Sequence, residues 1–254
     1  MNIDVLRAAV SGTEWRRVDV VAETGSTNAD LIARAARGED IAGYVLSAEH
    51  QSAGRGRHGR SWSAPARSQI SMSVGVDATG VPPSAWGWLP LLTGLAVAHT
   101  VRRDYGIGAG VKWPNDVLIG TGKLAGILAE VAAPVIVVGL GLNVSLTADE
   151  LPDPRAVSLS MLDRDVDRSE LAAAVLRELS ARLHSWRTAD PALASDYRSV
   201  STTIGNRVRA ILPSDTEIVG TAIDVDDAGR LLIDDAGTTV TVSAGDITHP
   251  RPVD

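Results

Sequence analysis

The sequence contains no cysteine, and no stretch of it is apolar and long enough to span a membrane. Without cysteine there can be no disulfide, no zinc–thiolate site and no thiol nucleophile, which fits a reducing compartment. No apolar run approaches the ~20 residues of a membrane span, and nothing near Met1 resembles a signal peptide. We therefore expect a cytoplasmic protein that does not enter a membrane.

The chain also lacks the excess of basic residues that marks a general nucleic-acid-binding surface. It has 24 Lys and Arg against 31 Asp and Glu, a formal net charge of −7. Binding to nucleic acid draws on a broad basic field, so we expect no nucleic-acid partner, and any site for an anion must be local. At 254 residues and 44% hydrophobic content, the chain is long enough for one large domain and a small one.

Hydrophobic periodicity and turn residues divide the chain into alternating helices and strands. Helices are expected within 26–38, 85–105 and 169–186, the last with Ser169 as its N-cap, and a shorter helix near 200. Strands are expected at 18–23, 44–49, 70–76, 110–119, 122–132 and 134–144, the last three in antiparallel order. Four short strands between 207 and 247 then indicate a small β-barrel of about fifty residues.

The stretch "QSAGRGRHGRSW", residues 51–62, concentrates positive charge in an otherwise acidic chain. Its G-x-G-x-x-G pattern matches a dinucleotide fingerprint, but "RSWSAPARSQ" is a poor helix former, and that fold needs a helix there to hold the pyrophosphate. A solvated basic loop is the plainer interpretation. Because Trp62 could stack on a base beside three arginines, we favour a flexible clamp for a polyanion, mobile over residues 52–63 without ligand.

Residues 112–116, "KWPND", place a lysine and two oxygen donors at a bend. Lys112 can meet a carboxylate or phosphate, and Asp116 can hold Mg²⁺, which binds to one or two carboxylates together with substrate phosphates. A plain Asn-Asp turn explains the same residues without any ligand.

Two further strands carry polar residues at their ends. In "GKLAGIL" Lys123 begins an apolar strand and Gly126 allows close approach of another group, although a lone lysine at a strand end is often only solvated. In "GLGLN" Asn143 ends a strand, and Gly139 and Gly141 indicate a bulge or a close neighbour inside it.

These motifs, together with "GSTN" near the first helix, occur in an order and spacing that resemble the biotin protein ligases. The resemblance runs from about Val18 to Ser145, and the C-terminal strands are similar to the small SH3-like domain of that family. It implies an α+β fold: a class II synthetase-like biotin/lipoate ligase catalytic domain over 1–202, with a mixed, largely antiparallel sheet and flanking helices, and an SH3-like β-barrel over 203–254.

The resemblance also implies a two-step, ATP-dependent reaction. Biotin and ATP, with Mg²⁺, give biotinyl-5′-AMP and pyrophosphate, and the biotin then passes to a lysine of a biotin carboxyl carrier domain such as that of acetyl-CoA carboxylase. Many bacterial members carry an N-terminal helix-turn-helix, for which the roughly seventeen residues before the first expected strand are too few. We expect a monofunctional ligase, a monomer or weak homodimer that does not bind DNA.

By match of motifs, the family's functional residues fall on particular positions of this chain. The resemblance assigns biotin binding to Ser26, Thr27, Gln51, Gly54, Arg55, Lys123, Gly126 and Gly141. It assigns ATP and adenylate binding to Arg57, Arg60, Trp62, Asn115, Asp116 and Asn143. It makes Arg57, Lys123 and Lys112 the catalytic cations and Asp116 the candidate ligand of Mg²⁺.

Two rival functions stay open on the sequence alone. A lipoate or octanoate ligase shares the expected fold and the acyl-transfer logic, although the Arg/Gly loop is typical of the biotin branch. A non-catalytic module could instead use the basic loop to dock an acidic carrier protein. None of the five histidines lies at metal-binding spacing, and His58, inside the loop, receives no role.

Overall fold

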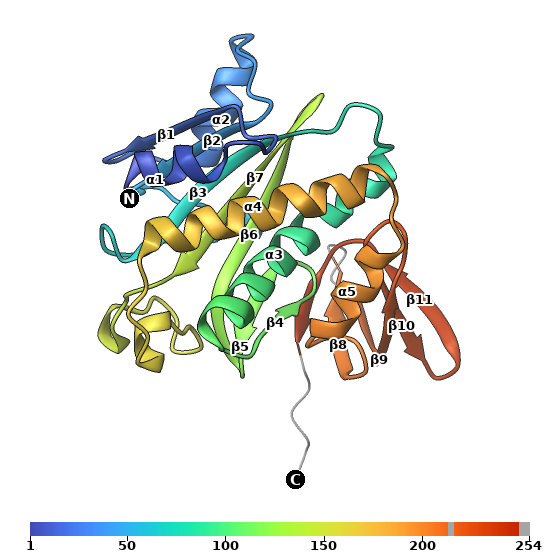
Figure 1. The fold of residues 1–254 in the computed structure, drawn as a ribbon. Helices are drawn as coiled ribbons and strands as arrows, with labels where there is room; N and C mark the ends of the chain where they lie inside the picture. Colours follow the sequence, from blue (N-terminus) through green and yellow to red (C-terminus); the bar gives the residue numbers. More distant parts are fainter. Residues whose placement is uncertain (213–215, 249–254) are drawn as a thin grey trace.

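The larger of two β-sheets forms the centre of the molecule in the computed structural model, which describes residues 1–212 and 216–248 (Figure 1). It has seven strands in the order β1-β2-β3-β7-β6-β5-β4. Its strands are β1 (Arg17–Val21), β2 (Tyr44–Ala48), β3 (Gln69–Asp77), β4 (Ala109–Lys112), β5 (Asp116–Ile119), β6 (Gly122–Ala132) and β7 (Val135–Asn143). Only β1 and β2 pair in parallel, so the expected mixed, largely antiparallel sheet is confirmed.

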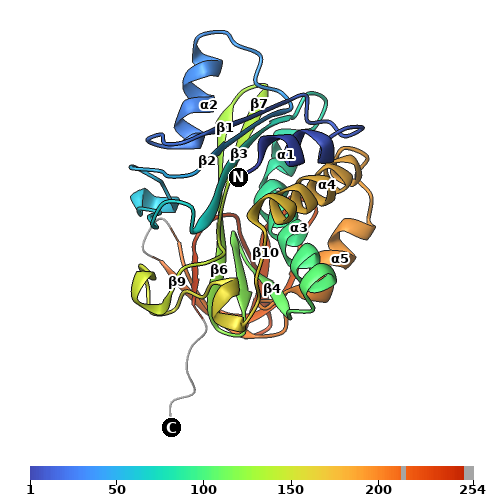
Figure 2. The same cartoon turned by 60° about the vertical axis from the view of Figure 1, so that its left-hand side comes forward.

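Helices cover both faces of this sheet. On one face α3 (Trp88–Tyr105) and α4 (Arg168–Arg187) pack against each other, and α2 (Thr27–Ala36) lies on the opposite face (Figure 2). A short helix α1 (Ile3–Ala9), absent from the sequence-based expectations, packs against α4, and its Leu6 is completely buried. A helix of seven residues carries too short a periodic pattern to be recognised from sequence.

Two helix starts differ from the prediction. Ser169 is not the N-cap of α4: the helix begins at Arg168, and the Asp167 carboxylate accepts from the amides of Ser169 and Glu170 at 2.6 and 3.1 Å. An aspartate two residues earlier is the stronger cap because its negative charge also interacts favourably with the positive end of the helix dipole. Helix α3 begins at Trp88 rather than Ala85, after a 3₁₀ turn.

The described part of the C-terminal region forms a second, antiparallel sheet after the short helix α5 (Ala192–Val200). Its strands are β8 (Arg207–Ile211), β9 (Glu217–Val225), β10 (Leu231–Asp235), β11 (Thr238–Val242) and β12 (Asp246–Thr248). Their order is β11-β10-β9-β8-β12, which confirms a small all-β unit at this end. Residues 249–254 of the predicted second domain lie outside the described residues.

Two tryptophans from the part of the chain that forms the larger sheet bind the turn between β9 and β10. The Trp113 indole donates to the Gly229 carbonyl, and the Trp88 indole donates to the Asp227 carbonyl, each at 2.9 Å. A Cβ on Gly87 would lie 2.5 Å from the Ala228 oxygen, so the two backbones meet there in close contact. These bonds place the second sheet beside the loop that follows β4.

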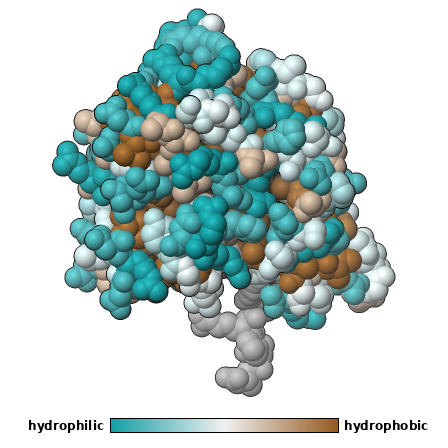
Figure 3. All heavy atoms as spheres, viewed as in Figure 1, coloured by the Kyte–Doolittle hydropathy of each residue, from teal (hydrophilic) through white to brown (hydrophobic). Residues whose placement is uncertain are grey.

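The surface in Figure 3 mixes hydrophilic and hydrophobic residues. The large hydrophobic side chains that are exposed among the described residues are Val131 on β6, Met161 in a 3₁₀ turn, and Val219 and Ile223, both on β9. Among the residues that the structure describes, no helix combines the length and apolar character needed to cross a membrane.

Candidate active site

A pocket of about 660 Å³ opens over the middle of the larger sheet and reaches the second one. Ligand sites commonly have volumes of roughly 300–1,000 Å³. Every candidate residue named from the sequence lines this pocket except Gly54. Gly54 is buried behind it, where a Cβ would lie 2.2 Å from the Trp62 carbonyl oxygen. The motifs, spread over more than a hundred residues of sequence, therefore converge on one place.

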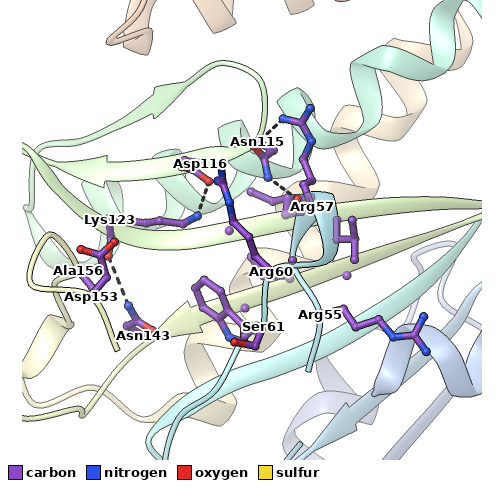
Figure 4. A pocket seen from close by; sticks show the side chains of 18 of the residues that line it. Arg55, Arg57, Arg60, Ser61, Asn115, Asp116, Lys123, Asn143, Asp153 and Ala156 are labelled. Carbon is purple, nitrogen blue, oxygen red and sulfur yellow. Dashed lines mark hydrogen bonds and ion pairs between the residues drawn. The ribbon is translucent and has the colours of Figure 1, made fainter. Parts of the chain in front are cut away.

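Two cationic side chains meet the "KWPND" bend at the centre of the pocket (Figure 4). The Lys123 ammonium lies 2.7 Å from the Asp116 carboxylate. Arg57 donates at 3.3 Å to the side-chain oxygen of Asn115 and at 3.4 Å to the Gly245 carbonyl of the second sheet region. The Arg/Gly loop and the bend thus form one charged wall.

The rest of the loop divides between the pocket and its rim. Arg60 pairs with the Asp246 carboxylate on β12, and the His58 ring lies 3.8 Å from the same carboxylate. Arg57 and Arg60 point toward Asn115 and Asp116, whereas Arg55 points away from them (Figure 4). Cations from a single loop therefore face two different sets of partners.

Burial disfavours the charged form of two of these cations. Half-buried Lys112, on β4, has its pKa lowered by desolvation, and nearby Asp116 opposes that shift. Desolvation likewise lowers the pKa of Arg57, against the attraction of Asp246 and Asp116. A guanidinium stays charged at any working pH. The wall therefore keeps a positive charge that the nearby carboxylates only partly neutralise.

Trp62 forms part of the floor, across two glycines. A Cβ on Gly141 would lie 2.3 Å from the indole, and one on Gly126 would lie 3.1 Å from it. The indole donates to the Gln69 side chain at 2.6 Å, and the Lys123 ammonium stands 5.6 Å from the ring centre. The close neighbour predicted from the glycines of β6 and β7 is confirmed, and at Gly141 it is this indole.

The opposite end of the pocket is neutral and polar. Ser26 caps α2, its hydroxyl accepting from the Ala29 amide at 3.4 Å. The Gln51 side-chain oxygen accepts from the Thr27 amide at 2.9 Å and contacts the Thr27 hydroxyl at 3.1 Å. A helix start and a strand end are thus joined by side-chain hydrogen bonds.

Asn143 and Asn115 use their amide groups to hold neighbouring backbone. The Asn143 nitrogen donates to the carbonyls of Lys123, at 3.4 Å, and Val157, at 3.1 Å. It thereby ties residues 155–157 to the start of β6. Asn115 donates to the Ile127 carbonyl at 2.8 Å. Both asparagines therefore shape the pocket wall as well as lining it.

Sequence reasoning gave no role to several residues that line the pocket: Asn28, Ser73, Asp153, Arg155 and Asp246. Asn28 ends the quoted motif "GSTN", so its position was a usable signal. Arg155 pairs with Asp153 at 2.8 Å on the loop after β7, where no pattern marks them. Asp246 lies 186 positions from its partner Arg60, and no local pattern reveals such a contact.

The described residues contain no group of three or more histidine, aspartate or glutamate side chains that could cage a metal. Asp116 does fit the looser requirement of Mg²⁺, one carboxylate completed by substrate phosphates, although it already pairs with Lys123. The dinucleotide alternative fails as expected, because no α-helix follows the Arg/Gly loop before β3.

Two protein families match the chain. The Biotin/lipoate A/B protein ligase family matches residues 39–145, and the Biotin protein ligase C terminal domain matches residues 203–249. The chain is 58% identical over 247 residues to the biotin--[acetyl-CoA-carboxylase] ligase of Mycobacterium tuberculosis, an alignment that covers 95% of this chain and 92% of the relative. It is 32% identical to the bifunctional ligase/repressor BirA of Escherichia coli, over 91% of this chain and 73% of that protein.

Solved structures of biotin protein ligases also resemble this chain. The biotin protein ligase of Aquifex aeolicus in complex with biotin and ATP superposes with a TM-score of 0.80 at 25% identity, covering 92% of this chain and 98% of that one. The biotin protein ligase of Leishmania major in complex with biotinyl-5-AMP superposes with a TM-score of 0.62, which supports the fold.

Proposed function

The chain belongs to the biotin/lipoate A/B protein ligase family as a biotin protein ligase, and we propose how the residues of its pocket divide the two steps of that activity. In the first step the biotin carboxylate attacks the α-phosphorus of ATP and pyrophosphate leaves. In the second, the amine of a carrier lysine attacks the carbonyl carbon of the biotinyl adenylate and AMP leaves.

The observation that carries the proposal is a neutral end and a cationic end within a single pocket. We call residues Ser26, Thr27, Gln51 and Ser73 the vitamin end, and residues Arg57, Arg60, Lys112, Lys123 and Asp116 the nucleotide end. The uncharged bicyclic head of biotin suits the first. The triphosphate, and the carboxylate that must approach it, suit the second, since fixed cations offset the repulsion between two anions.

Charge stabilisation supplies most of the chemistry of the first step. Arg57, Lys123 and Lys112 face the position where negative charge gathers on the phosphoryl oxygens and the departing pyrophosphate. None of them needs to act as nucleophile, because biotin attacks first and the carrier amine second. Positioning the two substrates in line accounts for the remaining acceleration.

The nucleotide itself is held, in this proposal, by the loop and the strand ends. Arg60 binds the triphosphate, Trp62 packs on the adenine, and Asn143 fixes the wall beside it. Asn115 orients Arg57 through their 3.3 Å contact. Arg55 and the backbone of Gly54 complete the vitamin end from the loop side.

Magnesium fits Asp116, which would share its carboxylate between the metal and Lys123. A bound Mg²⁺ supplies charge neutralisation to the triphosphate. The bend "KWPND" fixes the backbone of Asp116, which lies opposite Lys112 in the register of β4 and β5.

The partner that we propose is a biotin carboxyl carrier domain, as the name of the mycobacterial relative implies for that protein. We place the activity in the cytoplasm, which the lack of cysteine supports, and we expect a monomer or weak homodimer. The net charge of −7 supports a ligase that does not bind DNA.

We also propose a division into 1–202 and 203–254. Residues at the junction are packed rather than extended, since the Thr202 amide donates to Val111 at 2.8 Å and the Trp113 amide donates to the Thr203 hydroxyl at 3.0 Å. The second region lends Gly245 and Asp246 to the nucleotide end, which supports a part in ATP handling.

Exchange of labelled pyrophosphate into ATP tests the first step. Biotin with Mg²⁺ should support exchange, whereas lipoate or octanoate should not. Exchange with lipoate alone would assign the chain to the rival ligase branch. If no small acid supports exchange while a carrier domain alone raises the melting temperature, the chain is a binding module.

A further inference from the structure

A line of polar side chains leads away from the vitamin end, along the face of the sheet that α2 covers, to Glu130 on β6. Thr27 and Ser73 oxygens lie 2.6 Å apart, Ser73 donates to the Asn28 oxygen at 2.6 Å, and the Asn28 nitrogen donates to Glu130 at 2.8 Å. We call these four residues the polar relay. Three of them are almost completely buried, with exposures of 3% for Thr27, 0% for Ser73 and 4% for Asn28.

The orientation of the Asn28 amide is settled by its neighbours. Its nitrogen lies 3.1 Å from the Leu128 carbonyl, which can only accept, and 2.8 Å from the Glu130 carboxylate. The opposite orientation would face oxygen against oxygen at both places. The side-chain oxygen of Asn28 therefore points at Ser73.

This orientation fixes the hydroxyl protons one after another. Ser73 has one proton, and Asn28 offers it only an acceptor, so the Ser73 proton points at Asn28. The Ser73 oxygen then accepts the Thr27 proton across 2.6 Å. The 3.1 Å contact from Thr27 to Gln51 is longer, and that Gln51 oxygen already accepts from the Thr27 amide at 2.9 Å. Thr27 consequently offers the pocket a lone pair and no proton.

A glycine makes room for the relay. Gly139 lies in register between Ser73 of β3 and Leu128 of β6, on the part of the sheet that Asn28 covers. A Cβ on Gly139 would stand 2.4 Å from the Asn28 oxygen. Any larger residue would push the amide away from Ser73 and break the relay at its central link.

We propose that Ser73 and Asn28 are positioning residues that hold the Thr27 hydroxyl as a hydrogen-bond acceptor, so that the vitamin end selects a head group with N–H donors. A cyclic urea carries two N–H groups beside its carbonyl, whereas a dithiolane ring carries none. A dithiolane would leave the buried acceptors of the vitamin end without a hydrogen-bond donor, and this strongly lowers its binding affinity relative to a cyclic urea. The inference rests on the proposed roles of Thr27 and Gln51 at the vitamin end.

The test is Ser73→Ala, which removes the oxygen that receives the Thr27 proton across 2.6 Å and leaves the Thr27 hydroxyl only the longer 3.1 Å contact to the Gln51 oxygen, so that its proton is no longer held away from the pocket by a short bond. The KM for biotin in pyrophosphate exchange should rise about tenfold or more, with kcat and the KM for ATP within about twofold of the wild type. Ser73→Thr, which restores a hydroxyl, should recover much of the affinity. Ser47→Ala is the matched control, a serine of 0% exposure on the adjacent strand and outside the relay, and should leave the KM unchanged.

Gly139→Ala provides a second route, since it displaces Asn28 without touching any hydroxyl. It should reproduce the rise in KM for biotin, and the Ser73→Ala/Gly139→Ala double variant should be no worse than the more affected single variant, because both break one chain. An unchanged KM for biotin in folded Ser73→Ala, or full additivity in the double variant, would overturn the relay. If the wild type catalysed no exchange with biotin, the proposed function itself would be wrong, whatever the result for the relay.

Discussion

The two ends of the pocket are built in opposite ways. At the vitamin end, nearly every polar atom has a partner, and Thr27 and Ser73 are buried to 3% and 0% exposure. At the nucleotide end, the Arg60 side chain is 67% exposed, and the Lys112 ammonium makes no hydrogen bond or ion pair within the described part of the chain, where only the charges of Asp116 and Asp246 favour its protonated form. The hydrogen bonds of the vitamin end are formed without a ligand, whereas the nucleotide end carries positive charge that an anionic ligand would neutralise.

This difference matches the ligands that we propose for the two ends. A neutral head group is recognised by direction, which requires fixed hydrogen bonds, and fixed bonds are reliable only where water is excluded. A triphosphate is recognised by charge, which acts over several ångströms and tolerates movement. The expected mobility of residues 52–63 without ligand belongs to the second strategy and stays a prediction.

The largest effect is expected at the nucleotide end from Arg57→Ala. Loss of a fixed cation facing the transition state should lower kcat for pyrophosphate exchange by about 100- to 1,000-fold. The melting temperature should change little, because the loss of the bonds from Arg57 to Asn115 and Gly245 is offset by removal of a desolvated charge.

Arg37→Ala is the control for that variant. Arg37 pairs with Glu39 at 3.0 Å on the exposed end of α2, outside the pocket, so its removal should leave exchange intact. Equal activity in the two alanine variants would mean that the cationic wall does not serve the first step.

An intermediate effect, on stability, is expected from Lys112→Met. Burial lowers the pKa of Lys112 below 10.5, so between that lowered value and 10.5 the unfolded chain binds more protons than the folded one. The contribution of Lys112 to the free energy of unfolding therefore rises with pH through that window. Below the window the lysine is charged in both states, and its burial destabilises the folded state fully. Removing the charge at neutral pH should stabilise the protein by about 1 kcal/mol, roughly 2–4 °C in melting temperature.

Thermal unfolding of both proteins from pH 7 to above 10.5 measures this. The advantage of Lys112→Met should shrink as the wild-type lysine loses its proton, while its exchange activity is low throughout. A difference in melting temperature that does not vary with pH would place the effect in packing, and the nucleotide end would not be under electrostatic strain.

The smallest effect is expected from Asp246→Asn, which removes the carboxylate that pairs with Arg60 and faces His58. The pair is exposed, and such pairs are worth at most about 1 kcal/mol, so the KM for ATP should fall by no more than about fivefold. The change should fade in high salt, which screens an exposed pair. A rise in the KM for ATP would show instead that Asp246 helps the loop to bind nucleotide.

Much of the site was accessible from short motifs. The Arg/Gly loop, the "KWPND" bend and the glycines of β7 were each ambiguous alone, and each had a plain structural explanation. They line one pocket of about 660 Å³, which supports the proposed site, and the role of each residue stays a prediction. Gly54 is the exception, because a motif shows which residues belong together but not which of them face the ligand.

Helix ends were less accessible. Asp167 and Ser169 are both good capping residues, and the choice between them depends on Ser169 being engaged by the Asn2 amide at 2.9 Å. Helix α1 has too few residues for a pattern, and it persists because its Leu6 is buried against the rest of the protein.

The sequence by itself determined the chemistry available to this protein: which side chains carry charge, where glycine permits close approach, and that no thiol takes part. Only the tertiary structure decided partnership, such as the line of hydrogen-bonded side chains from Asn28 through Ser73 to Thr27 and the contact of Asp246 with a loop residue 186 positions away. The physical reason is that hydrogen-bond direction and ion pairing depend on distances of a few ångströms between segments far apart in the chain, and local patterns contain no information about those distances.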